Sequence, residues 1–531
     1  MLRLLTTVDL FAGAGGLSYG FERTGQIRIV AAAEKNPNAR KTYRKNHPAV
    51  RYFYEDVQDI DYDEIKSAFG AIDLVIGGPP CQGFSNANRQ HTTMISMNNR
   101  LVKEFVRCIC ELRPRAFLME NVAMLRSQVH RFIVDESDFA DPGLQGFNLR
   151  EDKLELLPAD AQFAGALEMV QSMDTNQIEK WTDRRVTVFT VLYRYRINQA
   201  KFDKAIEKHK KYLLSELSNM LAAEDNDPII AAERIMAETL LKYINGQKQE
   251  FSVLIDLIKK PLFAQRMLER LQEIKNYSIH VYGYETDNGA IVACVKSYAV
   301  LDYIRGVLQD RLGYTITEQL YNAADYGAPQ NRERYIIVGL AADQPGIFMP
   351  PAPVAEFLFT RRTVREAISD IEDIEPFTEM TDKGIPLPHR DDLSDLAKEL
   401  RGSMLYNHIC TDTTDVALAR FSALKSGQNF HDLDPSLKTT YSNAARTQNT
   451  IYMRLIYDQP SSTVVNVRKS MWIHPTRDRA ISIREAARLQ TFPDSYVFEG
   501  TKDSQYQQVG NAVPPILAAA IAVQLIKAMG E

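Results

Sequence analysis

The sequence predicts an α/β protein built on a doubly wound, mostly parallel sheet. Over residues 1–125, short apolar runs alternate with amphipathic helical patterns, as in successive strand–helix–strand units. Most of the apolar runs end in a polar or conformationally special residue, and ligands bind at the carboxyl ends of strands in such sheets. At 531 residues, 45% hydrophobic and 25% charged, the chain has the composition of a globular protein and length for two or three domains.

The expected elements follow in chain order. Strands are expected at Leu4–Val8, Ile27–Ala33, Val50–Tyr54, Asp73–Ile76 and Ala116–Met119, with helices at Ala39–Asn46 and Arg100–Leu112. Residues 127–297 form a charge-mixed helical pattern, for example at Ala200–Leu221 and Ile229–Ile274. The α/β pattern resumes at Tyr298–Leu312, followed by strands at Tyr314–Leu320 and Arg334–Leu340. Residues 345–475 are irregular, and 476–531 return to helical patterns.

Charge and cysteine content exclude several classes of protein. A net charge of -5 argues against a generic polycation that coats nucleic acid, although a locally basic groove remains compatible with it. Five scattered cysteines without a CxxC pair indicate neither a disulfide framework nor a zinc site, so we expect no metal and a reducing compartment. We expect no signal peptide and no apolar run of membrane-spanning length.

The segment Pro79-Pro80-Cys81 follows the apolar run Leu74–Gly78. Two prolines fix the backbone beside a thiol at the point where a buried strand leads into a polar loop. A buried cysteine commonly serves as a small apolar side chain, and by itself the segment fits packing and covalent chemistry equally well. Glu120, which ends the following strand, would lie close to any group that Cys81 attacks, and this favours chemistry.

A second group of residues indicates a nucleotide-like cofactor. The run Asp9–Leu17 is a strand end followed by a glycine-rich turn, which lets the backbone approach a ligand closely. Glu34 ends the second strand, where a carboxylate accepts both ribose hydroxyls, and Asp56 after the third strand is placed for an adenine amino group. Phe11 is a candidate to stack on the purine. Without a Walker lysine, an adenosine cofactor lacking phosphates is favoured over NAD or ATP.

The run Gln330-Asn331-Arg332-Glu333-Arg334 places two arginines on one side of an extended segment. Such a pair binds a carbonyl oxygen or a phosphate bidentately, whereas a surface ion-pair ladder with Glu333 is the structural alternative.

Together these motifs resemble the DNA (cytosine-5) methyltransferases, in the order in which that family carries them. The resemblance covers residues 1–125 and 298–531. The segments that carry it are Asp9–Gly16, Gly78–Ser85, Glu120–Val122, Gln330–Arg334, Arg484–Pro493 and Gly510–Pro515. It implies a class I S-adenosylmethionine-dependent methyltransferase fold, with 1–126, 298–344 and 476–531 forming the catalytic domain, 127–297 a helical insertion, and 345–475 a smaller target-recognition domain.

The resemblance also implies the chemistry. Cys81 would add to C6 of a flipped-out cytosine, Glu120 would hold the N3 and N4 edge, and Arg334, with Arg332 less directly, would position O2. The implied S-adenosylmethionine site is formed by Phe11, Gly13, Gly15, Glu34, Asp56, Pro80, Asn511 and Val513. The candidate DNA contacts are Gln82, Ser85, Arg89 and Gln330. Candidate base-reading segments are Tyr406–His408, Ser426–Asn429, Tyr441–Thr447 and Arg468–Lys469.

The expected function is sequence-specific methylation of double-stranded DNA in the bacterial cytoplasm, at the nucleoid. It would protect host DNA in a restriction–modification system, with any cognate endonuclease acting separately, or act as a solitary enzyme. RNA methylation of the transfer-RNA type is the alternative within this chemistry, but the Cys-Phe-Thr tripeptide of that branch does not occur. A silent DNA-binding homologue would lack Cys81, Glu120 or Arg334, and an NAD dehydrogenase explains neither the Pro-Pro-Cys nor the arginine motif. For the insertion, an inert bulge, a partner or dimer surface, and an additional DNA contact all stay open.

Overall fold

The computed structural model describes residues 3–80, 100–126, 131–140, 147–172, 180–223, 228–354, 361–441 and 444–531. The chain divides into two compact units. The first, the catalytic unit, comprises the described residues up to 126 and those from 304 on; the second, the inserted unit, comprises the described residues between 131 and 303. Residues 298–303 thus belong to the inserted unit, slightly beyond the expected boundary at 297.

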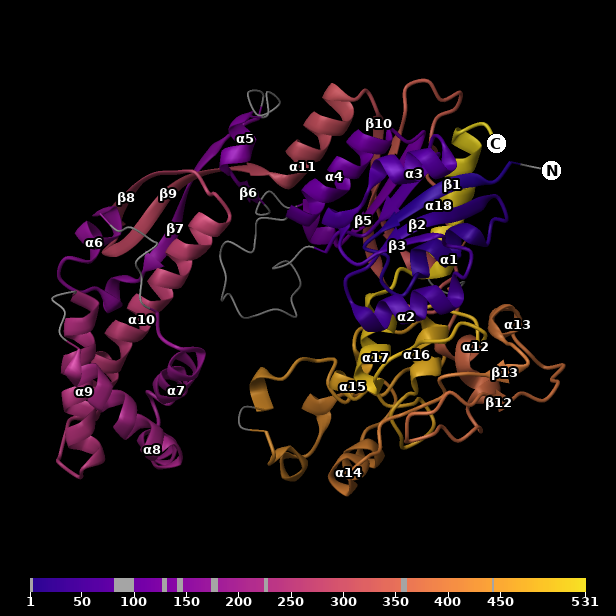
Figure 1. Cartoon of the computed structure of the whole chain (residues 1–531). Helices are drawn as coiled ribbons and strands as arrows, with labels where there is room; N and C mark the ends of the chain where they lie inside the picture. Colours follow the sequence, from indigo (N-terminus) through magenta and orange to yellow (C-terminus); the bar gives the residue numbers. More distant parts are fainter. Residues whose placement is uncertain are drawn as a thin grey trace. The chain divides into compact units, whose positions relative to one another are not determined.

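A seven-stranded sheet forms the centre of the catalytic unit, in the order β10-β11-β5-β4-β1-β2-β3 (Figure 1). Its strands are β1 (Leu5–Leu10), β2 (Ile27–Ala33), β3 (Tyr52–Tyr54), β4 (Leu74–Gly77), β5 (Ala116–Asn121), β10 (Thr315–Asn322) and β11 (Glu333–Leu340). Strand β11 runs antiparallel to both of its neighbours, β10 and β5, and the pairings from β5 to β3 are parallel. The order reverses at β1, between β2 and β4, which makes the carboxyl end of β1 the switch point where ligands bind.

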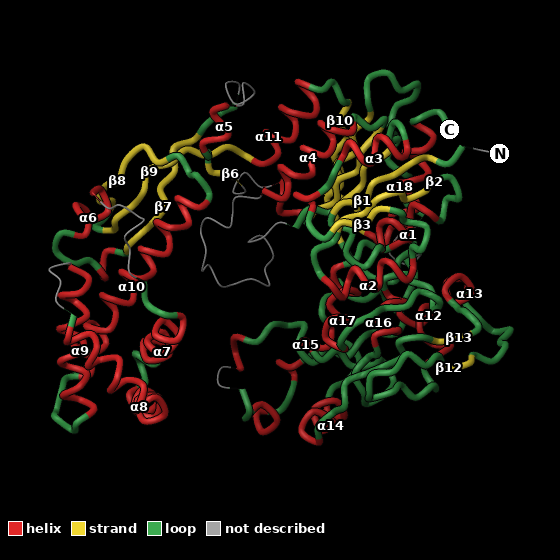
Figure 2. The backbone as a smooth tube through the Cα atoms, viewed as in Figure 1, coloured by secondary structure: helices red, strands yellow, loops and turns green. Residues whose placement is uncertain are grey.

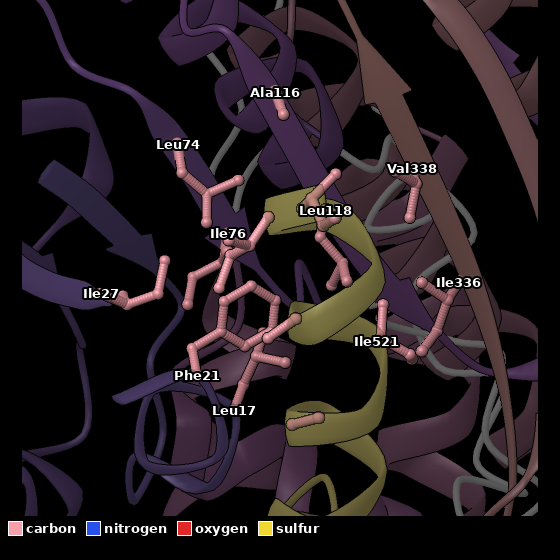
Figure 3. Close-up of a cluster of buried hydrophobic side chains, with 14 of the residues drawn as sticks. Leu17, Phe21, Ile27, Leu74, Ile76, Ala116, Leu118, Ile336, Val338 and Ile521 are labelled. Atoms are coloured by element: carbon pink, nitrogen blue, oxygen red, sulfur yellow. The ribbon is translucent and has the colours of Figure 1, made fainter. Parts of the chain in front are cut away.

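Helices cover both faces of this sheet. They are α1 (Gly16–Glu22), α2 (Pro37–Asn46), α3 (Tyr62–Phe69), α4 (Arg100–Leu112) and α18 (Pro515–Ala528). Helix α18 packs beside α1 against the apolar face formed by Ile76, Leu118 and Ile336 (Figure 3). Gly20 makes this contact possible, since a Cβ there would lie 2.5 Å from the Pro515 carbonyl. On the opposite face, Phe105 of α4 packs edge-on against Phe117 of β5.

One helical stretch, 502–528, is long and apolar enough to cross a membrane, contrary to the expectation that none would be. In the structure it is divided into α17 (Lys502–Asn511) and α18, and 67% of its apolar window is buried inside the protein. Burial against the sheet accounts for its composition, as for any core helix.

Residues 361–511 carry short elements around two further apolar cores. The elements are α12 (Val364–Ile368), β12 (Ile385–Pro386), α13 (Asp395–Leu400), β13 (Met404–Leu405), α14 (Asp415–Ala423), α15 (Val467–Ser470), α16 (Ile483–Leu489) and α17. One core takes α14 and the other takes most of the remaining elements. Val364 and Leu396 share the latter core with Ile483 and Val509. The expected target-recognition segment 345–475 and the C-terminal segment from 476 on therefore belong to the same compact unit.

The inserted unit is not purely helical, and the expectation of a helical insertion requires correction. It contains β6 (Arg131–Ile133), β7 (Arg150–Leu157), β8 (Val281–Asp287) and β9 (Ala290–Ala299), which form an antiparallel sheet (Figure 2). Its helices are α5 (Glu136–Ala140), α6 (Ala166–Ser172), α7 (Asp183–Arg194), α8 (Gln199–Ala222), α9 (Pro228–Ile244), α10 (Phe251–Asn276) and α11 (Val300–Ile304). The helix expected over Ile229–Ile274 is two helices, interrupted at residues 245–250.

Candidate functional site

The carboxyl ends of β4 and β5 meet at the site. Gly77 of β4 pairs with Met119, so the next residues, Gly78 and Glu120, lie side by side. A Cβ on Gly78 would lie 2.8 Å from Glu120 Oε2. Glycine at position 78 is therefore what lets the Glu120 carboxyl lie against the end of β4.

Asn121 fixes the backbone that leads into the Pro-Pro-Cys loop. Its side-chain Nδ2 donates to the Pro79 carbonyl at 3.1 Å, and the Asn121 side chain is buried. Pro79 is buried and Pro80 is exposed, so the chain leaves the sheet between these two residues. Cys81 follows at once, but it lies outside the described residues, as do Gln82, Ser85 and Arg89. Their predicted roles stay predictions.

Arg334 pairs with Glu120 at this edge. Arg334 Nε lies 2.5 Å from Glu120 Oε1, and the two side chains are only 13% and 15% exposed. Burial lowers the pKa of Arg334, and the Glu120 carboxylate opposes that shift. Nη1 of Arg334 donates to the Glu333 carbonyl at 2.7 Å, which orients the guanidinium. The pair presents an acceptor and a donor group together beside the end of β4.

Arg332 does not share this position. Its Nη1 donates to the Val464 carbonyl and its Nη2 to the Gly510 carbonyl, each at 2.8 Å, and the residue is 1% exposed. Burial, with neighbouring Arg334, lowers the pKa of Arg332 well below its usual value. Arg332 therefore joins the start of β11 to two later segments of the chain. Any effect of Arg332 on catalysis would arise indirectly, from the position of these segments.

Gln330 does not meet the expectation of a DNA contact. It is fully buried; its Nε2 donates to the Leu489 carbonyl and to Gln490 Oε1, and its Oε1 accepts from Val464 N–H at 3.1 Å. With both amide atoms occupied inside the protein, Gln330 has no group left for DNA. Asn407 and His408 are likewise buried, so their expected role in reading bases is wrong. Ser426 and Lys469 are exposed, and their roles stay predictions.

The other side of the switch point carries the cofactor candidates. Glu34 Oε2 accepts from Gly13 N–H at 2.8 Å and Oε1 from Asn36 N–H at 2.7 Å, so the carboxylate is fixed beside the glycine-rich turn. Each oxygen keeps a lone pair for a ribose hydroxyl. Asp56 caps the turn Val57–Asp59 and pairs with Lys35 at 2.8 Å. The hydrogen bond from Lys35 is the largest cause that lowers the pKa of Asp56.

The glycine-rich turn has the left-handed backbone that its composition predicts. Phe11, Gly13 and Gly15 have φ values of 57°, 56° and 86°. A Cβ on Gly13 would meet nothing within 4 Å, so this part of the turn faces open space. A non-glycine residue with positive φ is uncommon, and Phe11 holds this conformation at the edge of that space.

The C-terminal segment reaches the same turn, as the resemblance implies. A Cβ on Gly16 would lie 2.6 Å from the Val513 carbonyl. Val513 is 7% exposed and belongs to the core between α18 and the sheet, whereas Asn511 is exposed and accepts from Gln507 Nε2 at 2.8 Å.

Asp9 is a buried acid at the end of β1 to which the sequence assigned no role. Desolvation raises its pKa to about 7, while Ser18 and Tyr43 donate to its Oδ2. Its Oδ1 is buried without a hydrogen-bond partner. An acid between the apolar residues Val8 and Leu10 of a buried strand is the pattern by which it could have been recognised.

The residues present fit an adenosine cofactor: Gly13 borders open space, Glu34 is fixed beside it, and Asp9 keeps an unused buried oxygen. In the described part of the chain, no group of three or more histidine, cysteine or acidic side chains could hold a metal ion.

Comparisons with known proteins agree with this geometry. The family model of C-5 cytosine-specific DNA methylases matches residues 5–137 and 300–527. Type II methyltransferase M.DdeI of Desulfomicrobium norvegicum is 26% identical over 98% of this chain and 88% of its own length. M.AgeI of Thalassovita gelatinovora is 26% identical over 98% of both chains. The crystal structure of a putative prophage-encoded DNA modification methyltransferase from E. coli covers 99% of this chain, with a TM-score of 0.52 and 20% identity. That structure supports the fold, and the family match shows that the chain belongs to the C-5 cytosine-specific DNA methylases.

Proposed function

We propose that this cytosine-5 DNA methyltransferase uses Cys81 as its nucleophile and S-adenosylmethionine as its methyl donor. One observation carries the proposal: the Glu120–Arg334 pair lies against the end of β4. In the sequence, Cys81 comes three residues after Gly78, which lies beside Glu120 at that end. The acceptor and the donor at this strand edge are groups that can hold a cytosine, and the sequence supplies a thiol to attack its ring shortly after the same strand.

The proposed steps use these three side chains. The Cys81 thiolate adds to C6, and electron density moves to C5, which is otherwise a weak nucleophile. Glu120 accepts from the N4 amino group and holds a proton at N3, which neutralises the negative charge that builds on the ring, while Arg334 donates to O2. After methyl transfer, a base such as water takes the C5 proton, and the electron pair of the C5–H bond expels the Cys81 thiolate from C6, which restores the aromatic ring and returns the N3 proton to Glu120. Because C6 is stacked inside a duplex, the target nucleotide must be flipped out.

S-adenosylmethionine supplies an electrophilic methyl group when bound. Glu34 would bind its ribose hydroxyls, Phe11 would stack on the adenine, and Asp56 would accept from the adenine amino group. The glycine-rich turn, Pro80, Asn511 and Val513 would line the remainder of this site. Exposed Lys35 pairs with Asp56 without the ligand, so binding would loosen that ion pair.

We further propose that the protein protects host DNA in a restriction–modification system. The relatives that carry this idea are named Type II methyltransferases and align with nearly the whole chain. In this role it would act on double-stranded DNA in the cytoplasm of a bacterium, with any cognate endonuclease a separate protein. The target sequence would be read by the 345–475 segment. Mapping 5-methylcytosine at base resolution in a naive host expressing the protein tests this: methylation in one sequence context is expected, and no mark in any context contradicts it.

The nucleophile is tested with duplex DNA that carries 5-fluorocytosine at the mapped target. Fluorine at C5 cannot leave as a proton does, so the C6–sulfur adduct is trapped. The native protein with S-adenosylmethionine is expected to form a denaturant-resistant adduct, and Cys81→Ala none. Cys294→Ala, which removes a partly exposed thiol in the inserted unit, is the matched control and should form the adduct normally. An adduct with Cys81→Ala would show that another residue is the nucleophile.

A further inference from the structure

A row of polar side chains, two of them buried, lies directly behind the glycine-rich turn, and the proposed mechanism does not use it. It consists of Glu22 at the end of α1, His47 after α2 and Tyr496 after α16, and we call it the turn relay. His47 Nδ1 lies 2.6 Å from Glu22 Oε2, and His47 Nε2 lies 3.0 Å from the Tyr496 hydroxyl. That hydroxyl donates to the Ala14 carbonyl of the turn. His47 and Tyr496 are 3% and 2% exposed.

Simple hydrogen-bond chemistry fixes the direction of the turn relay. The Ala14 carbonyl only accepts, so Tyr496 donates its single proton there, and its oxygen accepts from His47 Nε2. With a proton on Nε2, the ring faces Glu22 either as an imidazolium beside a carboxylate or as a neutral ring beside a carboxylic acid. In both forms Glu22 orients His47, His47 orients Tyr496, and Tyr496 holds the turn.

The turn itself is shaped to accept this contact. A Cβ on Gly15 would lie 2.6 Å from the Tyr496 hydroxyl and would also collide with His47. Gly15 therefore serves two needs, since its φ of 86° also lies in the left-handed region. Ala14 stands between Gly13, whose N–H is bound by Glu34, and Gly15. The turn is thus held on one side by Glu34 and on the other by Tyr496.

The position of Tyr496 is in turn set by its surroundings. The neighbouring Val497 exchanges two hydrogen bonds with the Asn46 side chain, Val497 N–H donating at 3.0 Å and Asn46 Nδ2 donating at 2.8 Å. The Tyr496 ring packs against Phe492 and Tyr19, with ring centroids 4.8 and 5.2 Å apart. A hydroxyl presented from so fixed a ring constrains the turn rather than following it.

We infer that the turn relay holds the glycine-rich turn in its ligand-binding conformation, so that His47 and Tyr496 are positioning residues for S-adenosylmethionine. The inference rests on the proposed function, which places the cofactor at this turn. A preformed loop binds more tightly because less ordering accompanies binding. Removing the hydroxyl that fixes Ala14 should therefore weaken cofactor affinity without touching the reacting groups.

The test is Tyr496→Phe in the full chain, which removes one hydroxyl and keeps the aromatic packing. S-adenosylmethionine binding is measured by calorimetry without DNA, together with kcat and the KM for the cofactor. We expect the Kd and the KM to rise about tenfold, the effect of one buried hydrogen bond, with kcat changed less than about twofold. Glu22→Gln, at the partly exposed end of the turn relay, is a second variant and should weaken binding by a smaller factor.

Tyr506→Phe is the matched control. Tyr506 is 1% exposed, and its hydroxyl donates to the Ile409 and Ile481 carbonyls, away from the turn. It should lower the unfolding temperature but leave the Kd unchanged. Cofactor affinity that is unaltered in both turn-relay variants, or weakened equally by Tyr506→Phe, overturns the inference while the proposed function stands. A native protein that does not bind S-adenosylmethionine overturns the proposed function instead.

Discussion

The catalytic unit and the inserted unit are assembled in opposite ways. The central sheet of the catalytic unit joins β1–β5 to β10 and β11, which follow almost 200 residues later, and α18 at the end of the chain covers it. The inserted unit is local: its sheet and α6–α10 come from one stretch of chain between 131 and 303, around cores of their own. The family model omits residues 138–299, which lie within that unit. The chemistry therefore depends on long-range contacts within the catalytic unit. The inserted unit has apolar cores of its own, which can support its folding.

Each unit contains one of the two tryptophans of the chain, which allows the units to be followed separately. Trp472 is fully buried in the catalytic unit, and Trp181 is 6% exposed in the inserted unit. Fluorescence of Trp181→Phe reports on the catalytic unit alone, and fluorescence of Trp472→Phe reports on the inserted unit alone.

The largest expected effect contrasts one carboxylate from each unit. Glu120→Gln keeps the size of the side chain but removes the charge that Arg334 and the cytosine edge use, and we expect about a 10³-fold loss of methylation, the typical scale for lost charge stabilisation at a reacting group. Glu233 in the inserted unit accepts from Trp181 Nε1 at 2.6 Å and is 8% exposed. Glu233→Gln should lower the unfolding midpoint reported by Trp181 and leave the methylation rate within about twofold, since it changes buried contacts of the inserted unit, among them those with Trp181 and Gln265.

Tritiated-methyl transfer to mapped DNA measures the first effect, and denaturant titration in the Trp472→Phe background measures the second. Activity that falls as far in Glu233→Gln as in Glu120→Gln would show that the inserted unit takes part in the chemistry, and the contrast would then be wrong.

The next effect compares two arginines that each bind two backbone carbonyls. Arg332→Ala leaves the Val464 and Gly510 carbonyls buried without a donor. We expect the free energy of unfolding to fall by about 4 kcal/mol, since each unpaired carbonyl costs about 2 kcal/mol. Arg270 in α10 donates to the Glu155 and Leu156 carbonyls from a half-buried position, so Arg270→Ala should cost about 1–2 kcal/mol, because water replaces part of the contact.

Denaturant titration of each unit, followed through its own tryptophan, checks the pair. Arg332→Ala should also reduce activity, and Arg332→Lys should restore only part of both losses because lysine cannot reach two carbonyls in a fixed fork. If Arg332→Ala and Arg270→Ala lowered the free energy of unfolding equally, long-range and local contacts would contribute equally to stability, and the predicted contrast would be wrong.

Prediction from the sequence succeeded in the catalytic unit because its strands are short apolar runs with marked ends. The limits of β2 and the C-terminal limit of α4 were predicted to the residue, and those of the other strands to within two residues. The packing of α18 beside the glycine-rich turn was also expected, from the resemblance. What single residues do was harder to predict: Gln330 and Arg332 look like surface polar groups in the sequence, and only the tertiary fold buries them against Leu489, Val464 and Gly510.

The antiparallel sheet of the inserted unit was missed in part because its strand β7 is rich in charged residues. β7 reads Arg-Glu-Asp-Lys-Leu-Glu-Leu-Leu, a composition that also suits an exposed helix. A local pattern was nevertheless present, since Asn288-Gly289 joins β8 to β9 with φ values of 46° and 83°. An Asn-Gly pair between alternating apolar residues is typical of a two-residue hairpin.

The smallest expected effect is a pH dependence of stability that arises from the buried acid Asp9 and that only the catalytic unit should show, because that unit contains Asp9. The pKa of Asp9 is raised from 3.8 to about 7 by burial, so the folded catalytic unit binds this proton more tightly than the unfolded chain. The contribution of Asp9 to the stability of the catalytic unit should therefore be greatest below about pH 4, fall as the pH rises toward 7, and level off above that value. Between pH 5.5 and 8 the decrease from this group is about 2 kcal/mol, obtained from the two pKa values at 1.36 kcal/mol per unit.

Asp9→Asn should remove that decrease from the transition reported by Trp472, because asparagine accepts from Ser18 and Tyr43 without ionising. The transition reported by Trp181 should keep its pH dependence, since the inserted unit does not contain Asp9. Free energies of unfolding at pH 5.5 and 8, measured for both tryptophan backgrounds with and without Asp9→Asn, decide the matter. An unchanged pH dependence of the catalytic unit in Asp9→Asn would assign it to another group, and a change in both transitions would show that the two units unfold together rather than separately.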